Sequence, residues 1–198
     1  MSNAAKSTIS RTEEILDVAQ DLIQTKGYNG FSYRDIAAAI GIKSASIHYH
    51  FPTKGDLGQS VTARYRDRFS QALQTVLETT EGTRPRLESY AALFRNTLVE
   101  CDRLCMCGML AGEIETIPDI VKTEVSRFFE EQEHWLSHVI EQGITAKEIQ
   151  PSTNPQTWAA TLLASLEGAM LVFRGFNHSE SFDIVVQNLL DTLFAPAK

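Results

Sequence analysis

Helical periodicity runs through almost the whole chain, and no other feature restricts the possible fold as much. Apolar residues recur every three or four positions, as in the stripe Ile15, Ala19 and Leu22. Alternating β-branched runs bounded by turn residues, which are typical of strands, are nearly absent. The sequence therefore predicts an all-α fold of about nine helices.

Capping patterns and helix breakers place the ends of these helices. Three hydroxyl residues are each followed three positions later by an acid, the spacing of a capping box: Ser10–Glu13, Ser32–Asp35 and Thr53–Asp56. Glycines and prolines mark several helix ends. The predicted helices cover about residues 12–25, 33–40, 44–50, 54–80, 85–103, 105–115, 118–143, 154–175 and 181–194.

The charge of the chain is divided unevenly between its two parts. The net charge is −7, but residues 1–68 hold nine Lys/Arg and seven Asp/Glu, a balance of +2. Residues 69–198 hold nine Lys/Arg and eighteen Asp/Glu, a balance of −9. The N-terminal third is compatible with phosphate contact, whereas the remainder would be repelled by DNA.

Composition points to a folded cytoplasmic protein. Hydrophobic residues make up 43% and charged residues 22% of the 198 residues, which argues against wholesale disorder. No apolar run approaches membrane-spanning length and no secretory signal precedes the first helix, so we expect no membrane partner. The three cysteines are too few and too clustered for a disulfide framework.

Three short helices with a tight turn between the second and third predict a helix-turn-helix. Ala37 is small enough for the two helices to approach closely, and Gly41, four residues later, suits a reversal of the chain. Ile42 and Ile47 would fill the angle between the helices, and Phe51 would close the small core. The alternative is a helical module that contains Ala-x3-Gly by chance.

The outer face of the third helix has the composition of a DNA-reading surface. It carries short polar groups, rings and a cation, and no acid occurs between Asp35 and Asp56. For Tyr49 the alternative is packing into the domain, and of His48 and His50, which alternate sides, one is expected to meet phosphate. The expected DNA-binding residues are Ser32, Tyr33, Arg34, Lys43, Ser44, Ala45, Ser46, His48, Tyr49, His50 and Lys54.

Residues 27–57, GYNGFSYRDIAAAIGIKSASIHYHFPTKGDL, resemble the DNA-binding domain of the TetR family of transcriptional regulators. The family pattern is G-(x3)-F/T-(S/T)-x3-I-A-x2-A-G-(V/I)-S-x-G-x-(L/I)-Y-x-Y-F-x2-K-x2-L. Three departures prevent transfer of base preference: Lys43 stands where a capping Ser/Thr is usual, Ala45 replaces a common glycine, and residues 48–50 change the aromatic order. The resemblance implies a DNA-binding domain at residues 1–55 and a ligand-binding and dimerisation domain at residues 56–198.

The last two predicted helices are the candidates for a dimer interface. Small residues such as Ala160, Ala164 and Gly168 would allow another helix to approach closely. Two such pairs about a two-fold axis would form a four-helix bundle and set two recognition helices about 34–36 Å apart. The alternative is that these helices are internal core. The expected dimer residues are Trp158, Leu162, Leu166, Met170, Phe173, Val186, Leu189, Leu190 and Leu193.

The segment 101–115, CDRLCMCGMLAGEIE, has the soft and small side chains of an adaptable pocket wall. A subset of the resembled family responds to oxidants or electrophiles through thiols, which would require exposure and a lowered pKa at Cys105 or Cys107. Arg103 would favour such a pKa and Asp102 would oppose it; the alternative is a buried, inert thiol. The pocket or sensor candidates are Cys101, Cys105, Cys107, Met109, Phe128 and Trp135.

Metal binding and catalysis find little support. The pattern C-x3-C-x-C offers few ligands, and His134 and His138, although spaced i and i+4, lie in a stretch rich in Glu. No catalytic motif is present, so neither an enzyme nor a cofactor is predicted. We predict a homodimeric repressor that a small molecule or thiol-reactive signal releases from a palindromic operator. The alternatives are a helical ligand-binding or thiol-sensing protein without direct DNA regulation and a small cysteine-dependent enzyme.

Overall fold

The computed structural model describes residues 10–178 and 181–196. Residues 1–9 of the first predicted domain and residues 197–198 of the second lie outside the described residues. Over the described ranges the chain forms nine α-helices and one π-helical turn without any strand, which confirms the all-α prediction. The elements are α1 (Arg11–Lys26), α2 (Tyr33–Ile40), α3 (Ser44–His50), α4 (Lys54–Thr79), α5 (Thr83–Arg95), η1 (Asn96–Glu100), α6 (Met106–Gly112), α7 (Asp119–Thr145), α8 (Pro155–Phe176) and α9 (Phe182–Leu193).

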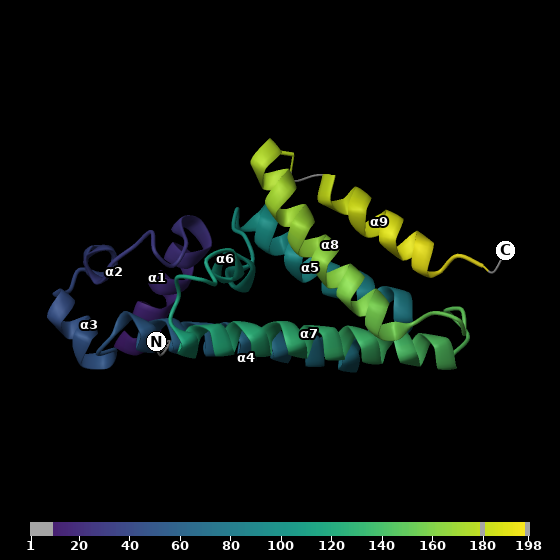
Figure 1. The fold of residues 1–198 in the computed structure, drawn as a ribbon, viewed down its shortest axis with the longest axis horizontal. Coiled ribbons are helices and arrows are strands. Elements are labelled where there is room, and N and C mark those ends of the chain that lie inside the picture. The colour runs from purple at the N-terminus through teal and green to yellow at the C-terminus, as the bar shows by residue number, and fades with distance from the viewer. Residues whose placement is uncertain (1–9, 179–180, 197–198) are drawn as a thin grey trace, which may run out of the picture.

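The helices form a small head, α1 to α3, at one end of a larger body (Figure 1). The two long helices α4 and α7 lie side by side along the molecule, and α5, α8 and α9 pack over the part of them farther from the head. α4 begins in the head and continues into the body, so the expected border at residues 55/56 falls in its first turn.

Two hydrophobic cores hold the structure together, and α6 contributes to both. The head core gathers apolar side chains of α1 to α4 around Ile36 and Ile47, and it includes Met106 and Leu110 of α6. The body core is rich in aromatic rings and includes Cys107 of the same helix. Because successive positions of α6 face different cores, this short helix packs between head and body.

The fifth and sixth predicted helices are shorter than expected. α5 ends at Arg95 and continues as the π-helical turn η1, in which the Cys101 N–H donates to the Asn96 carbonyl at 3.1 Å. Asp102 then adopts a left-handed conformation with φ 52°, which ends the helix before the predicted residue 103. α6 covers Met106–Gly112 instead of 105–115, because Glu113 is drawn toward the head.

Two of the predicted capping boxes are complete and one is half formed. Asp56 accepts hydrogen bonds from the backbone N–H and hydroxyl of Thr53, and Ser32 makes the same pair with Asp35. Ser10 accepts from the Glu13 N–H at 3.2 Å, but the Glu13 carboxylate does not return the bond. It pairs instead with Arg64 of α4 at 2.7 Å, so this acid links two helices.

Candidate nucleic-acid interface and effector site

The turn between α2 and α3 has the geometry that the sequence predicts. Gly41 adopts the left-handed conformation, with φ 68° and ψ 35°, and the Ile42 N–H returns to the Ala37 carbonyl at 3.0 Å. Ala37 and Ile47 are buried between the two helices. α3 is therefore held across α2 with its other face turned outward, at the end of the molecule opposite the C-terminus (Figure 1).

The outer face of α3 is open to solvent and free of acids. The Tyr49 side chain is 85% exposed, so the alternative that it packs into the domain is wrong. Two open grooves flank the helix: one is lined by Arg11, Ile42, Ala45, Ser46, Tyr49 and His50, and the other by Ser32, Tyr33, Arg34, Ser44 and His48. Most of the predicted DNA-binding residues therefore lie together on one surface.

Tyr33 is one exception, because its side chain is buried. Its hydroxyl donates to the carbonyls of Phe51 and Thr53, at 2.9 and 2.6 Å, and burial together with the charge of Asp56 raises its pKa to about 12. These bonds hold the turn between α3 and α4. Tyr33 therefore fixes the recognition helix in place instead of presenting a hydroxyl to DNA, and we correct its expected role.

Lys54 is the second exception. Its ammonium group donates to the Phe31 carbonyl and lies 4.2 Å from the centroid of the Phe31 ring and 4.8 Å from that of Tyr28. Burial lowers the pKa of this group. The cation is thus engaged in tying α4 to the loop before α2, and the expectation that it faces a phosphate is wrong for this conformation.

The remaining cations of the surface stay exposed. Arg34 and Lys43 lie at the starts of α2 and α3, and Lys43 is the N-cap of α3 without a side-chain hydrogen bond. The sequence reasoning missed Arg11, which borders one groove beside His50. Its signal was a cation directly before the first predicted helix. His48 and His50 project to opposite sides of α3, with ring nitrogens 3.2 Å from the Pro52 carbonyl and the Thr12 hydroxyl.

Comparison with known families decides what this surface belongs to. The family described as "Bacterial regulatory proteins, tetR family" matches residues 15–61, which contain the whole helix-turn-helix. The description "Tetracyclin repressor-like, C-terminal domain" matches residues 83–189. The chain belongs to the TetR family of transcriptional regulators. It is a DNA-binding protein, and its helix-turn-helix is the DNA-binding element.

Individual relatives agree with this assignment over nearly the whole chain. A TetR transcriptional regulator from Legionella pneumophila is 31% identical, with a TM-score of 0.85 over 94% of this chain and 99% of its own. A TetR-family regulator from Agrobacterium tumefaciens is 30% identical, with a TM-score of 0.89 over 93% of this chain and 97% of its own. The transcriptional repressor DhaR of Mycobacterium sp. (strain GP1) is 27% identical over 86% of both chains.

In the body of this TetR-family protein, the pocket candidates separate into three places. Cys105, Cys107, Phe128 and Trp135 lie in the body core, whereas Met109 packs against the head core and Cys101 is exposed. Burial, with Glu167 nearby, raises the pKa of both buried thiols well above the ordinary value. A sensing thiol needs exposure and a lowered pKa, so the sensor expectation for Cys105 and Cys107 is wrong in this conformation.

The expected dimer residues are mostly internal. Leu162, Leu166, Met170, Leu190 and Leu193 are at most 4% exposed, and the other four pack against the same body core: Trp158, Phe173, Val186 and Leu189. We therefore correct the assignment of the five buried residues, which join α8 and α9 within their own protomer, as the internal-core alternative describes. Trp158, Phe173, Val186 and Leu189 are half-buried and stay dimer candidates.

The exposed face of α8 and α9 is apolar and narrow. Leu171 and Val172 are each 51% exposed, Phe176 is 68% and Ile184 of α9 is 62% exposed. Ala160 and Ala164 are exposed on the same helix, and added methyl groups at Gly168 and Gly175 would meet nothing within 4 Å. Within the described chain, α8 is the one helix long and apolar enough to span a membrane, although no apolar run in the sequence predicted such a helix.

α6 is bonded to the head at both of its ends. Before its first turn, the Leu104 carbonyl accepts a hydrogen bond from the buried Gln24 of α1 at 2.7 Å, and Arg103 pairs with Asp21 at 2.7 Å. After its last turn, the Glu113 carboxylate accepts from the Asn29 N–H at 2.9 Å. Movement of α6 would therefore be transmitted to α1 and to the loop before α2.

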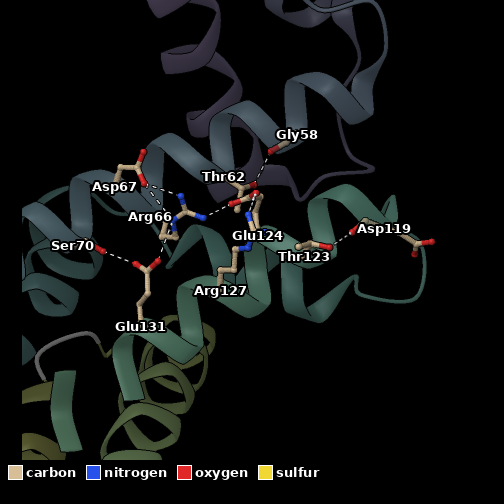
Figure 2. A network of polar contacts seen from close by, with 10 residues as sticks. All are labelled: Gly58, Thr62, Arg66, Asp67, Ser70, Asp119, Thr123, Glu124, Arg127 and Glu131. Atoms are coloured by element: carbon tan, nitrogen blue, oxygen red, sulfur yellow. Dashed lines mark hydrogen bonds and ion pairs between the residues drawn. The ribbon is translucent and has the colours of Figure 1, made fainter. Parts of the chain in front are cut away.

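A second connection joins α4 to α7 (Figure 2). Arg66 of α4 pairs with the buried Glu124 of α7. It also pairs, at 3.4 Å, with Glu131, which lies about two turns farther along the same helix. Arg127 also bonds Glu124, at 3.0 Å, and Ser70 donates to Glu131 at 2.6 Å. These bonds fix the position of α4, the helix that carries the head, against the long helix of the body.

Proposed function

We propose that this TetR-family DNA-binding repressor works in the cytoplasm as a homodimer that an effector releases from a near-palindromic duplex. The observation that carries the proposal is the outer face of α3, which is exposed, acid-free and bordered by the cations Arg11, Arg34 and Lys43. A short helix presenting polar groups and a ring suits the major groove, where base edges and phosphates need donors and few acids.

The exposed face of α8 and α9 supports the homodimer. Apolar side chains beside small residues allow close helix packing, and two copies about a two-fold axis would bury this face in a four-helix bundle. The same contact accounts for an α8 that is apolar on both sides. The two heads would then address half-sites about 34–36 Å apart.

The position of α6 supports release by an effector bound in the body. This helix packs in both cores and is bonded to the head at both ends. An effector that displaces α6 would therefore shift the head relative to α4 and change the separation of the two recognition helices. To act as a switch, it must bind the DNA-incompetent conformation better by a few kcal/mol.

Selection of duplexes from a random pool, followed by fluorescence anisotropy, tests the proposal. We expect nanomolar-range binding to a near-palindrome with steep salt dependence. Replacing Arg34 and Lys43 with Ala in both heads of the dimer removes four phosphate contacts, so the slope of log K against log salt should fall by about 3.6, since each contact contributes about 0.9. The control is Lys147→Gln, an exposed cation beyond the end of α7 remote from α3. Failure to select any duplex, or an unchanged slope, would refute the proposed docking.

A further inference from the structure

Glu167 is a half-buried acid with a buried carboxylate oxygen, and neither the head nor the dimer face uses it. It is the only charged residue between positions 155 and 173, on the apolar helix α8. Its carboxylate is wedged between α8 and α6, where it lies against Gly108 so closely that an added methyl group there would collide with it. One of its oxygens, Oε1, is buried and accepts no hydrogen bond from the described residues.

The groups that face this carboxylate carry no positive charge. Cys105, which precedes the first turn of α6, hydrogen-bonds to it. Cys107 of α6, Tyr65 of α4 and Tyr90 of α5 lie within electrostatic range of it. The pKa values of these thiols and phenols are raised well above their ordinary values, so they remain neutral near pH 7. Arg66 of α4 acts electrostatically on Cys107, but no Lys or Arg among the described residues forms an ion pair with Glu167.

The surrounding core is built of aromatic rings. Tyr90 stacks on Trp135 with centroids 5.5 Å apart and an angle of 17°, and Tyr65 packs on Phe128 at 5.6 Å. The Tyr90 hydroxyl and the Trp135 indole N–H are buried and make no hydrogen bond within the described chain. Such unpaired polar groups are costly in a protein interior unless a ligand pairs with them. A narrow apolar cleft between α5, α8 and α9 has Tyr90 in its wall.

We propose that this core binds a lipophilic amine in its ammonium form, with the ammonium paired to Glu167 and flanked by the rings of Tyr90 and Trp135. A buried carboxylate without a cation attracts positive charge, and aromatic faces stabilise an ammonium group. The inference rests on the proposed effector-released repressor and names its effector class. Because the carboxylate sits against Gly108, an ammonium inserted there would push α6 away from α8 and act on the head.

The protonation of Glu167 gives the binding a defined pH dependence. Burial raises the pKa of this carboxyl to about 7. The amine remains protonated between pH 6 and pH 8, and the neighbouring thiols and phenols do not ionise there, so only the acid changes charge. Affinity for the ammonium should therefore weaken by about tenfold from pH 8 to pH 6.

Calorimetric titration of the full chain with three matched probes tests the proposal. The probes are 1-naphthylmethylamine, the neutral 1-naphthylmethanol and the anionic 1-naphthoate. We expect the amine to bind at pH 8 at least tenfold more tightly than the other two, to weaken toward pH 6, and to lower affinity for the selected duplex. Equal or tighter binding of the alcohol or the naphthoate, or amine binding that does not change with pH, would overturn the proposal.

Two variants sharpen the test. Glu167→Gln keeps the shape of the side chain and removes its charge, so amine affinity should fall to that of the alcohol and lose its pH dependence. Glu130→Gln, a substitution of an exposed acid on α7, is the matched control and should bind like the wild type. The wild-type probe comparison decides the matter even if Glu167→Gln does not fold. A chain that binds its duplex but no amine refutes this inference alone, whereas a chain that binds no duplex refutes the proposed function.

Discussion

Replacing Arg66 with Met tests whether the α4–α7 network of Figure 2 holds the helix that carries the head. The Arg66 side chain is 17% exposed and that of its partner Glu124 is 4% exposed, so the pair is largely removed from water. Removing one partner of a buried pair costs about 3–5 kcal/mol, because the other charge is left uncompensated. Arg127, whose side chain is 56% exposed, keeps its bond to Glu124. We therefore expect the lower end, about 3 kcal/mol, and a melting temperature lower by about 6–12 °C.

Urea unfolding followed by circular dichroism, at one fixed protein concentration, measures this loss. The matched control is Arg68→Met on the same helix, whose side chain is 54% exposed and whose ion pairs should contribute less than about 1 kcal/mol. The double variant Arg66→Met/Glu124→Leu should cost less than the sum of its parts by about 1–3 kcal/mol. A loss at Arg66 no greater than at Arg68, or strict additivity in the cycle, would refute the reasoning.

Four further outcomes follow from the structure. Tyr49→Ala should change the free energy of unfolding by less than about 0.5 kcal/mol but weaken duplex binding by about 1–3 kcal/mol in anisotropy titrations; unchanged affinity would remove this ring from the interface. Tyr33→Phe should cost about 1–3 kcal/mol in urea unfolding, because it removes both hydroxyl bonds and leaves the buried Phe51 carbonyl without its donor, whereas the Thr53 carbonyl keeps the Leu57 N–H; a neutral result would contradict that role. Ala164→Glu should give a helical monomer by light scattering; a persisting dimer would place the interface elsewhere. Burial raises the pKa of Glu167 from 4.5 to about 7, so the folded chain holds this proton more tightly, and unfolding should become easier by about 2 kcal/mol from pH 5 to pH 7. Glu167→Gln should abolish that fall in stability.

Local sequence signals predicted the head well. The head's signals are local: capping boxes mark helix starts, and a left-handed glycine with a small residue four positions earlier forms its turn. Because these residues lie close together in the chain, they specify the turn independently of the rest of the fold. Gly41 and Ala37 stand where this reasoning put them. Lys43, which stands where a capping Ser/Thr is usual in the family, leaves α3 without a side-chain cap.

Side-chain direction was harder to predict where partners lie far apart in the sequence. Tyr33 turns inward to reach Phe51, and Lys54 turns inward to reach Phe31, over 18 and 23 residues. On the surface of an isolated helix both positions look available to DNA. Only the packing of α2, α3 and α4 around one core decides otherwise.

The dimer face was misassigned because α8 is apolar on nearly every side. In such a helix the apolar periodicity does not show which face is buried in the protomer. The bulkiest side chains were therefore predicted to form the interface, although they fill the protomer core. The exposed face was marked instead by small residues such as Ala164 and Gly168. Glu167 had a signal too, as a solitary charge in an apolar helix, but its buried surroundings depend on α6.

The sharing of α6 between two cores affects how freely the DNA-reading head could be exchanged among proteins. Met106 and Leu110 of α6, with Val121 of α7, complete the interior of the head, although even Met106 follows its last residue, His50, by 56 positions (106 − 50) in the chain. A fragment cut after residue 55 would leave those contacts open to water. Grafting this head onto the body of another protein would thus require that α6 and the first turns of α7 be transferred with it. Recombination between relatives should preserve the head and these segments as one unit.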